Sequence, residues 1–262
     1  MATLSPTGER YDLGRVLSRT FSQIVANWMV LGGFALIGAV VAAIFNAYGM
    51  REMLHIATNP DPANPLALFQ SPGYWIMLIG GLVVGALMQS SLTHGLLVGS
   101  RGESVAFGDC VSGAVRYFLP GIGLTILFYL GVGIGLMFIL VPGLILMTIW
   151  SVSFSALVGE DCGVTGAFGR SRALTKGLRW PVFGTLLVFF LVFGFLLFAV
   201  QGFSSTGMAR LYQSNMALAL VATTISGTIS TLLLTSFLVA LYREVVLVKE
   251  GEPRGGLAEV FS

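Results

Sequence analysis

The sequence predicts an all-α, polytopic membrane protein with six transmembrane helices arranged as three hairpins. Three observations indicate this fold class. Hydrophobic residues make up 55% of the 262 residues and charged residues only 10%, whereas a soluble domain usually has roughly 25% charged residues to cover its surface. Segments without ionised side chains recur at lengths that can cross a bilayer. The basic residues fall almost entirely between alternate segments, which is typical of multi-pass membrane proteins.

Five long gaps between charged residues contain the predicted spans. A bilayer-spanning helix needs about 20 mostly apolar residues. The gap from Arg116 to Glu160 is long enough for two helices, and Pro142-Gly143 inside it predicts the turn between them, because proline lacks a backbone donor. The predicted helices cover about 24–47, 75–98, 119–140, 143–159, 182–203 and 216–242. Residues 1–23 then form a tail with an interfacial helix, and 243–262 form a C-terminal tail.

The distribution of basic residues predicts the orientation of the chain. With six helices, all 14 Lys and Arg residues except Arg51 and Arg210 lie on the side that holds both termini. Positive residues mark the cytoplasmic side, so we expect both termini in the cytoplasm. No cleavable signal peptide is expected, because the first apolar run is too long. Cys110 and Cys162 fall in cytoplasmic loops, where no disulfide is expected and where two cysteines are a poor set for zinc.

A short amphipathic helix is predicted before the first, third and fifth spans. Apolar residues recur at helical spacing after Leu13 and Phe107 and, less regularly, after Val164. The three segments end at the aromatic residues Trp28, Tyr117 and Trp180. We interpret them as helices in the cytoplasmic headgroup layer, each preceding a hairpin, so that one unit occurs three times. The alternative is that any six-helix protein with basic cytoplasmic loops shows such likeness.

Residues 140–185 resemble a known family. The matching segment begins with Pro142-Gly143, continues with an apolar helix that leads to Glu160, and ends with residues 167–180, whose sequence is AFGRSRALTKGLRW. This order is similar to the membrane domain fused to some bacterial glycerophosphoryl diester phosphodiesterases, and to its stand-alone relatives, with the pattern A-[FL]-x-R-S-x-x-L-T-x-G-x-x-W. The resemblance implies a multi-pass protein of the bacterial cytoplasmic membrane. It does not imply phosphodiesterase activity, which belongs to a separate soluble barrel of about 250 residues that this chain cannot contain.

Two sets of polar residues are candidate sites. His94 is the one ionisable group inside a predicted span, and intramembrane ionisable residues are candidates for function. Hydroxyl residues recur at matching offsets in the second and fourth helices, which gives a possible intramembrane cluster of Ser91, Thr93, His94, Ser151 and Ser153. The alternative is that the hydroxyls bond to their own helix backbone and that His94 lies neutral near the headgroups.

The basic loop before the fifth span is the second candidate. Its cations could contact lipid headgroups, and they are Arg170, Arg172, Lys176 and Arg179. Topology determination alone would also explain them. Glu160 is expected to pair with Arg170 or Arg172 and hold the interfacial helix against the bundle, and the alternative is that Glu160 couples an ion. Pro142, Gly143, Glu160 and Trp180 are therefore predicted structural residues.

Pairs of small residues predict close helix packing. The pairs lie four residues apart, a spacing that lets two helix backbones approach each other. They are Gly38 and Ala42, Gly81 and Gly85, and Gly131 and Gly135. We expect these residues to serve packing and to form no site.

Three classes of function compete at this stage. The favoured class is a non-enzymatic membrane protein that organises lipids or partner proteins and contacts anionic headgroups. The alternative is a small transporter or channel for an apolar or amphiphilic substrate, although transporters usually place polar groups or broken helices near the midplane. An intramembrane enzyme needs a nucleophile and base or metal ligands, and no such set lies in the spans. No cofactor, metal or nucleic acid is expected, and protein partners stay open.

Overall fold

The computed structural model describes residues 10–59, 64, 66–138, 140–194 and 214–251. Every regular element in these ranges is helical. The elements are α1 (Leu13–Ala26), α2 (Trp28–Thr58), α3 (Ala67–Gln70), α4 (Pro72–Ser100), α5 (Phe107–Arg116), α6 (Phe118–Phe138), α7 (Leu140–Trp150), α8 (Ser153–Glu160), α9 (Gly163–Thr175), α10 (Arg179–Phe189), η1 (Phe190–Gly194) and α13 (Met216–Glu250).

Five stretches of the described chain are long and apolar enough to cross a membrane. They are α2, α4, α6, the α7–α8 stretch and α13. A sixth candidate consists of α9 together with α10 and η1, which are bent by 102°. The predicted fifth span, residues 182–203, is described only as far as Gly194, and the remainder lies outside the described residues. Several helices long and apolar enough to cross a membrane are therefore confirmed, and the exact number of spans stays a prediction.

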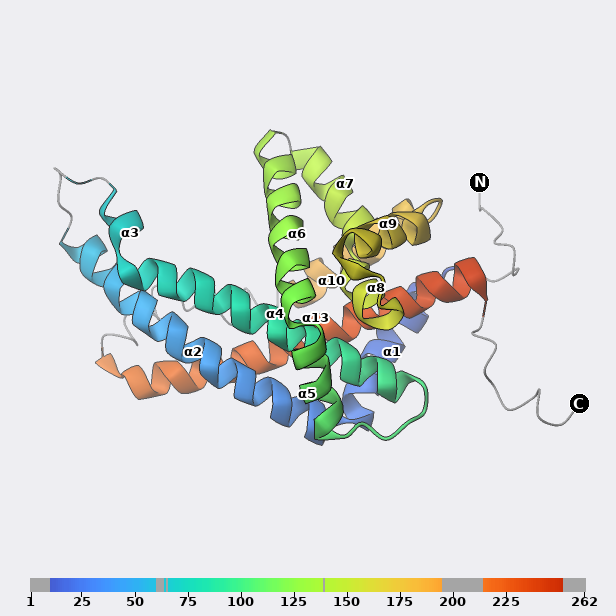
Figure 1. Ribbon diagram of the computed structural model, residues 1–262, viewed down its shortest axis with the longest axis horizontal. Coiled ribbons are helices and arrows are strands. Elements are labelled where there is room, and N and C mark those ends of the chain that lie inside the picture. The colour runs from blue at the N-terminus through green and yellow to red at the C-terminus, as the bar shows by residue number, and fades with distance from the viewer. Residues whose placement is uncertain (1–9, 60–63, 65, 139, 195–213, 252–262) are drawn as a thin grey trace, which may run out of the picture.

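Helices α2, α4 and α13 form the long layer of the molecule. They run side by side along its long axis, and α2 packs against both others (Figure 1). Their lengths of 31, 29 and 35 residues correspond to about 46, 43 and 52 Å, more than the hydrocarbon thickness of about 30 Å. Large apolar side chains such as Ile37, Ile79 and Ile225 are exposed on this layer, as expected for surfaces that face lipid.

The α6–α7 hairpin stands across this layer instead of beside it (Figure 1). The six predicted spans therefore do not lie parallel in one bundle. Its turn also differs from the prediction, since α6 ends at Phe138 and α7 begins at Leu140. Pro142 and Gly143 lie in the first turn of α7, where a proline costs no helical hydrogen bond. A Cβ on Gly143 would lie 2.8 Å from the backbone nitrogen of Leu136, so this glycine lets α6 and α7 approach closely.

Several helix ends differ from the predicted spans. The first span was expected to begin at residue 24, but the chain bends at Asn27, which separates α1 from α2. Helix α2 continues to Thr58, and Asn59 precedes Pro60, which disfavours helix in the residue before it. Helix α13 continues eight residues past the expected end at 242, so 243–250 are helix and not tail. The rest of the C-terminal tail, 252–262, lies outside the described residues.

Four short helices gather towards one end of the molecule, which we call the collar: α1, α5, α8, α9 and residues 241–250 of α13. Helix α1 packs along α13, α5 against α4, and α9 against α8. A buried hydrophobic cluster extends from the collar into the adjoining parts of α2, α4 and α10, and it includes Leu31, Leu92, Leu157, Leu174 and Leu241. Helices α1, α5 and α9 lie where short helices were predicted, and each is followed, after a break of one to three residues, by α2, α6 or α10.

Candidate functional site

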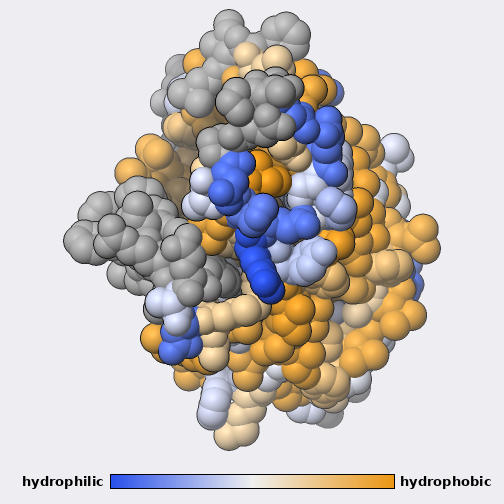
Figure 2. Space-filling model, turned by 90° about the vertical axis from the view of Figure 1, so that its left-hand side faces the viewer, coloured by the Kyte–Doolittle hydropathy of each residue, from blue (hydrophilic) through white to orange (hydrophobic). Residues whose placement is uncertain are grey.

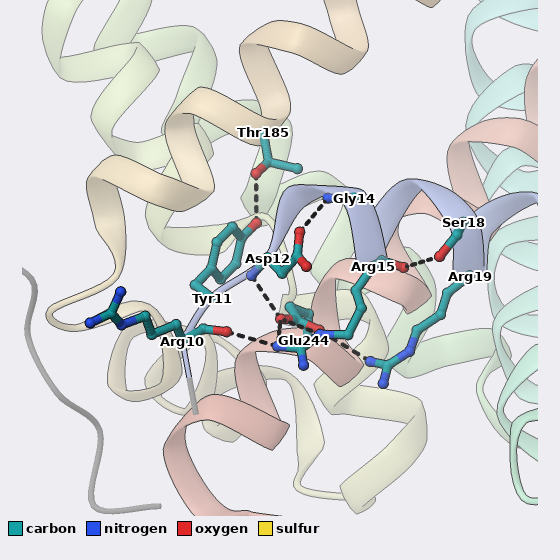
Figure 3. A network of polar contacts seen from close by, with 9 residues as sticks. All are labelled: Arg10, Tyr11, Asp12, Gly14, Arg15, Ser18, Arg19, Thr185 and Glu244. Atoms are coloured by element: carbon teal, nitrogen blue, oxygen red, sulfur yellow. Dashed lines mark hydrogen bonds and ion pairs between the residues drawn. The ribbon is translucent and has the colours of Figure 1, made fainter. Parts of the chain in front are cut away.

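A buried carboxylate joins the two ends of the chain within the collar. Glu244 on α13 is 0% exposed. Its Oε1 accepts from Arg15 Nη2 at 2.7 Å and from the backbone N–H of Asp12 at 3.0 Å, and its Oε2 accepts from Arg19 Nη1 at 3.2 Å (Figure 3). An unpaired buried charge is strongly destabilising, whereas this carboxylate is paired with two cations and a backbone donor. The network therefore fixes α1 to the C-terminal part of α13.

Tyr11 extends this contact to α10. Thr185 donates to the carbonyl of Pro181 at 2.9 Å, so the Tyr11 hydroxyl donates to Thr185 Oγ1, at 2.6 Å (Figure 3). Burial raises the pKa of Tyr11 above its usual range. The residues before α1 thus hold α13 and α10 together.

Sequence reasoning missed Glu244, because it placed residues from 243 onward in an exposed tail. A signal was present. The buried residues Leu241, Val245 and Val248 surround Glu244 at helical spacing, which indicates that the helix continues with one face covered. What the pattern could not show is that Arg15 and Arg19, more than 220 residues away, supply the partners.

Glu160 forms the second network of the collar. It accepts from Arg170 Nε at 2.6 Å and from the hydroxyl of Tyr242 at 2.8 Å. Arg170 also pairs with Glu250 at 2.7 Å. The ion pair expected between Glu160 and Arg170 is present, and the two further partners join α8, α9 and α13. Arg170 is occupied by two carboxylates, so it is not available as a free headgroup ligand.

The other cations of the basic loop are exposed. Arg172, Lys176 and Arg179 surround the bend between α9 and α10, and none forms an ion pair with a described residue. Trp180 follows them and is 83% exposed. Lys249 of α13 lies next to the same bend, because a Cβ on Gly177 would be 3.7 Å from its Nζ.

No hydrogen bond among the described residues joins the members of the predicted intramembrane cluster to one another. His94 Nδ1 lies 3.0 Å from the carbonyl oxygen of Asp109, so His94 holds α5 against α4. Ser91 and Thr93 are fully buried, and their hydroxyls have no partner among the described residues. Ser151 and Ser153 donate to carbonyls of their own segment, those of Thr148 and Trp150. These two serines line a cavity that Ser91, Thr93 and His94 do not line.

This cavity lies where the α6–α7 hairpin crosses the long layer. It measures about 850 Å³, is partly open, and is lined from α2, α4, α6, α7, α8, α10, η1 and α13 as well as by Ser151 at the α7–α8 break. Helix α6 touches α4 closely at Gly121, where a Cβ would lie 2.7 Å from Ser90 Oγ. Further along, Phe128 and Tyr129 line the cavity instead. Because the hairpin crosses the other helices, it contacts them closely near Gly121 and leaves space next to the later part of α6.

The glycine pairs behave in two different ways around this space. A Cβ on Gly131 would lie 2.3 Å from the Trp150 ring, so this glycine serves close packing as predicted. Gly81 and Gly85 line the cavity, and a Cβ on either would meet nothing within 4 Å. The close packing expected at Gly81 and Gly85 is not present among the described residues, because none of them lies opposite these two glycines.

A second, smaller pocket lies at the opposite end from the collar. It measures about 500 Å³ and is lined mainly by polar residues of α2 and of the segment before α4. Figure 2 shows hydrophilic side chains gathered on this end within a largely hydrophobic surface. Glu52 accepts from Ser71 and, at 2.6 Å, from the backbone N–H of Gly73, so it secures the start of α4. Arg51 and His55 are exposed at its edge.

The described residues contain no group of three or more His, Cys, Asp or Glu side chains that could hold a metal ion. Comparison of the chain with protein families, with curated proteins and with solved structures finds no match. The resemblance of residues 140–185 to the membrane domain of the phosphodiesterases therefore stays a prediction.

Proposed function

We propose that the protein is a non-enzymatic, multi-pass protein of the bacterial cytoplasmic membrane that organises lipids by binding anionic headgroups at its collar. One observation carries this proposal. The cations Arg172, Lys176 and Arg179 are exposed and pair with no acidic side chain among the described residues, at the point where a short helix meets an apolar one. Trp180 beside them is a residue type enriched at membrane–water interfaces.

Charge pairing within the collar distinguishes the cations that hold helices together from those that can bind lipid headgroups. Arg15, Arg19 and Arg170 are held by Glu244, Glu160 and Glu250. Lys249 joins the three free cations around the α9–α10 bend. Each Lys or Arg near an anionic leaflet contributes about 1 kcal/mol of attraction, so this set attracts an anionic surface appreciably.

The apolar side chains at the three helix breaks support the same placement. Trp28 is 61% exposed where α1 meets α2, and Val115 is 75% exposed where α5 meets α6. Trp180 occupies the third break. Helices that lie in the headgroup layer insert such side chains between the lipids and keep their cations near the phosphates. We infer that α1, α5 and α9 lie at this level on the cytoplasmic side, with both termini in the cytoplasm.

The proposal is tested by measuring lipid preference in nanodiscs or detergent. The variant R172Q/K176Q/R179Q removes the free cations and leaves the paired ones intact. We expect phosphatidylglycerol to bind the wild-type protein more tightly than phosphatidylcholine does. The affinity of the variant for phosphatidylglycerol should be about 100-fold lower than that of the wild type. Native mass spectrometry of bound lipids measures both. Arg51→Gln is the matched control, because it removes an exposed cation at the opposite end. Equal binding of the two lipids by the wild type would refute the proposal.

A second candidate, transport of an apolar or amphiphilic substrate, is favoured by the cavity of about 850 Å³. Purified protein in vesicles should then accelerate transfer of a fluorescent amphiphile between the leaflets. A rate equal to that of protein-free vesicles would leave lipid organisation as the function.

A further inference from the structure

The cavity beside the α6–α7 hairpin has the shape of a groove. Its lining on α2 extends from Gly38 to Met50, and its lining on α13 extends from Thr223 to Leu238. From the first to the last residue, these stretches of 13 and 16 residues extend about 18 and 22 Å along their helices. One leaflet contributes about half of the 30 Å hydrocarbon core, so the groove is long enough for a lipid chain.

The wall of the groove is built for a hydrocarbon chain. On α2 and α4 it consists largely of small residues, which are Gly38, Ala39, Ala42, Ala43, Gly81 and Gly85. Because a Cβ on Gly81 or Gly85 would meet no described atom within 4 Å, none of the described residues fills the space next to α4. Apolar walls without partner atoms lose dispersion contacts, and a chain that enters the groove restores them.

Polar groups lie at the end of the groove that is nearer the collar. Gln89 of α4 lines the cavity, and its Oε1 accepts from Thr235 at 3.0 Å. Its Nε2 donates to no described residue. Ser151 and Ser153 line the same cavity from the α7–α8 break. The groove thus offers free amide hydrogens next to its apolar wall.

No Asp, Glu, Lys, Arg or His is among the described residues that line the cavity. An ionised group would lose its hydration there without gaining a counter-charge, which is strongly unfavourable. An uncharged oxygen that accepts a hydrogen bond from Gln89 has no such cost. A ligand that comes from the bilayer gains little from leaving lipid, because both environments are apolar. Selectivity must therefore come from the polar end.

We propose that the groove binds a neutral amphiphile from the bilayer. Its hydrocarbon chain lies along the glycine- and alanine-rich wall of α2 and α4. Its uncharged headgroup oxygen accepts a hydrogen bond from Gln89 Nε2. This site is separate from the anionic-headgroup site at the collar, so either can exist without the other.

The test uses two photoreactive, clickable probes, a diacylglycerol and a phosphatidylglycerol, with the protein in nanodiscs. Labelled peptides are identified by mass spectrometry. We expect the diacylglycerol to label the lining segments of α2, α4 and α13 in the wild type, and excess unlabelled diacylglycerol to suppress this labelling. Gly85→Leu fills the space and should reduce labelling about tenfold. Gln89→Leu removes the donor and should reduce it about fivefold.

Gly133→Leu is the matched control, since Gly133 also faces open space but does not line the cavity. It should label like the wild type, and so should R172Q/K176Q/R179Q, which affects only the collar site. The experiment with excess unlabelled diacylglycerol uses only the wild-type protein, so it tests the proposal even if a variant fails to fold. Labelling that is not suppressed by competitor, or that is equal for Gly85→Leu and wild type, would overturn the proposal. Equal labelling of the groove by the phosphatidylglycerol probe would overturn the selection for a neutral headgroup.

Discussion

The collar and the region around the cavity differ in what fills the space between their helices. In the collar, buried leucines and two ion-pair networks occupy this space. Glu244 holds α1 to α13 through Arg15, Arg19 and the backbone N–H of Asp12. The neighbouring Tyr11 contacts α10 at Thr185. Around the cavity, Gly81 and Gly85 face open space. The collar is therefore held by specific polar contacts, whereas the region around the cavity leaves room that a lipid can occupy. This difference suits a protein that is anchored at one membrane face and binds lipid deeper in the bilayer.

Removing the carboxylate of Glu244 is the most severe test of this difference. In Glu244→Ala, Arg15 and Arg19 lose their buried partner, and Asp12 loses the acceptor of its backbone N–H. Breaking a buried charge pair by removing one partner typically costs about 3–5 kcal/mol. We expect a loss of that size in the free energy of unfolding in detergent, together with faster proteolysis near α1. Glu103→Ala, at an exposed site, should have no measurable effect. A collar variant as stable as the wild type would show that the network does not hold α1.

Two glycine substitutions of the same size sharpen the comparison. A Cβ at Gly143 meets the Leu136 backbone nitrogen at 2.8 Å, and a backbone atom cannot move aside as a side chain can. Gly143→Ala should therefore destabilise the protein by about 1–3 kcal/mol. Gly81→Ala meets open space and should stabilise α4 by about 0.5–1 kcal/mol, because alanine has the higher helix propensity. Thermal unfolding of both variants in one detergent measures these opposite changes in stability. A loss of stability in both variants would mean that Gly81 is packed against a neighbour.

The long apolar helices could be predicted from sequence because length and hydropathy are local properties. The span predicted at 75–98 lies inside α4, Pro72–Ser100, and the pair of Glu160 with Arg170 joins residues only ten apart. The turn at Pro142-Gly143 was misplaced because a proline tolerated in the first turn of a helix has the same sequence signal as one in a loop.

The sequence could not show which part of the fold packs against each residue. Gly81-Gly85 and Gly131-Gly135 have the same spacing, yet Gly131 packs on Trp150 and Gly85 faces a cavity. The difference depends on the crossing of the α6–α7 hairpin over the long layer, which no local pattern encodes. The burial of Glu244 likewise depends on where α1 docks.

Loss of the contact of Tyr11 with Thr185 should have a small effect on stability and a characteristic pH dependence. Tyr11→Phe removes one hydrogen bond and should cost about 1 kcal/mol at neutral pH. Burial raises the pKa of Tyr11 in the folded protein above the value of about 10 that an exposed tyrosine has when the chain is unfolded. The unfolded state therefore loses its proton first as the pH rises, so the stability that Tyr11 contributes is complete below pH about 10 and decreases above it. The difference in melting temperature between wild type and Tyr11→Phe should accordingly shrink between about pH 9.5 and pH 11, and a difference that grows with pH would contradict a buried, neutral tyrosine.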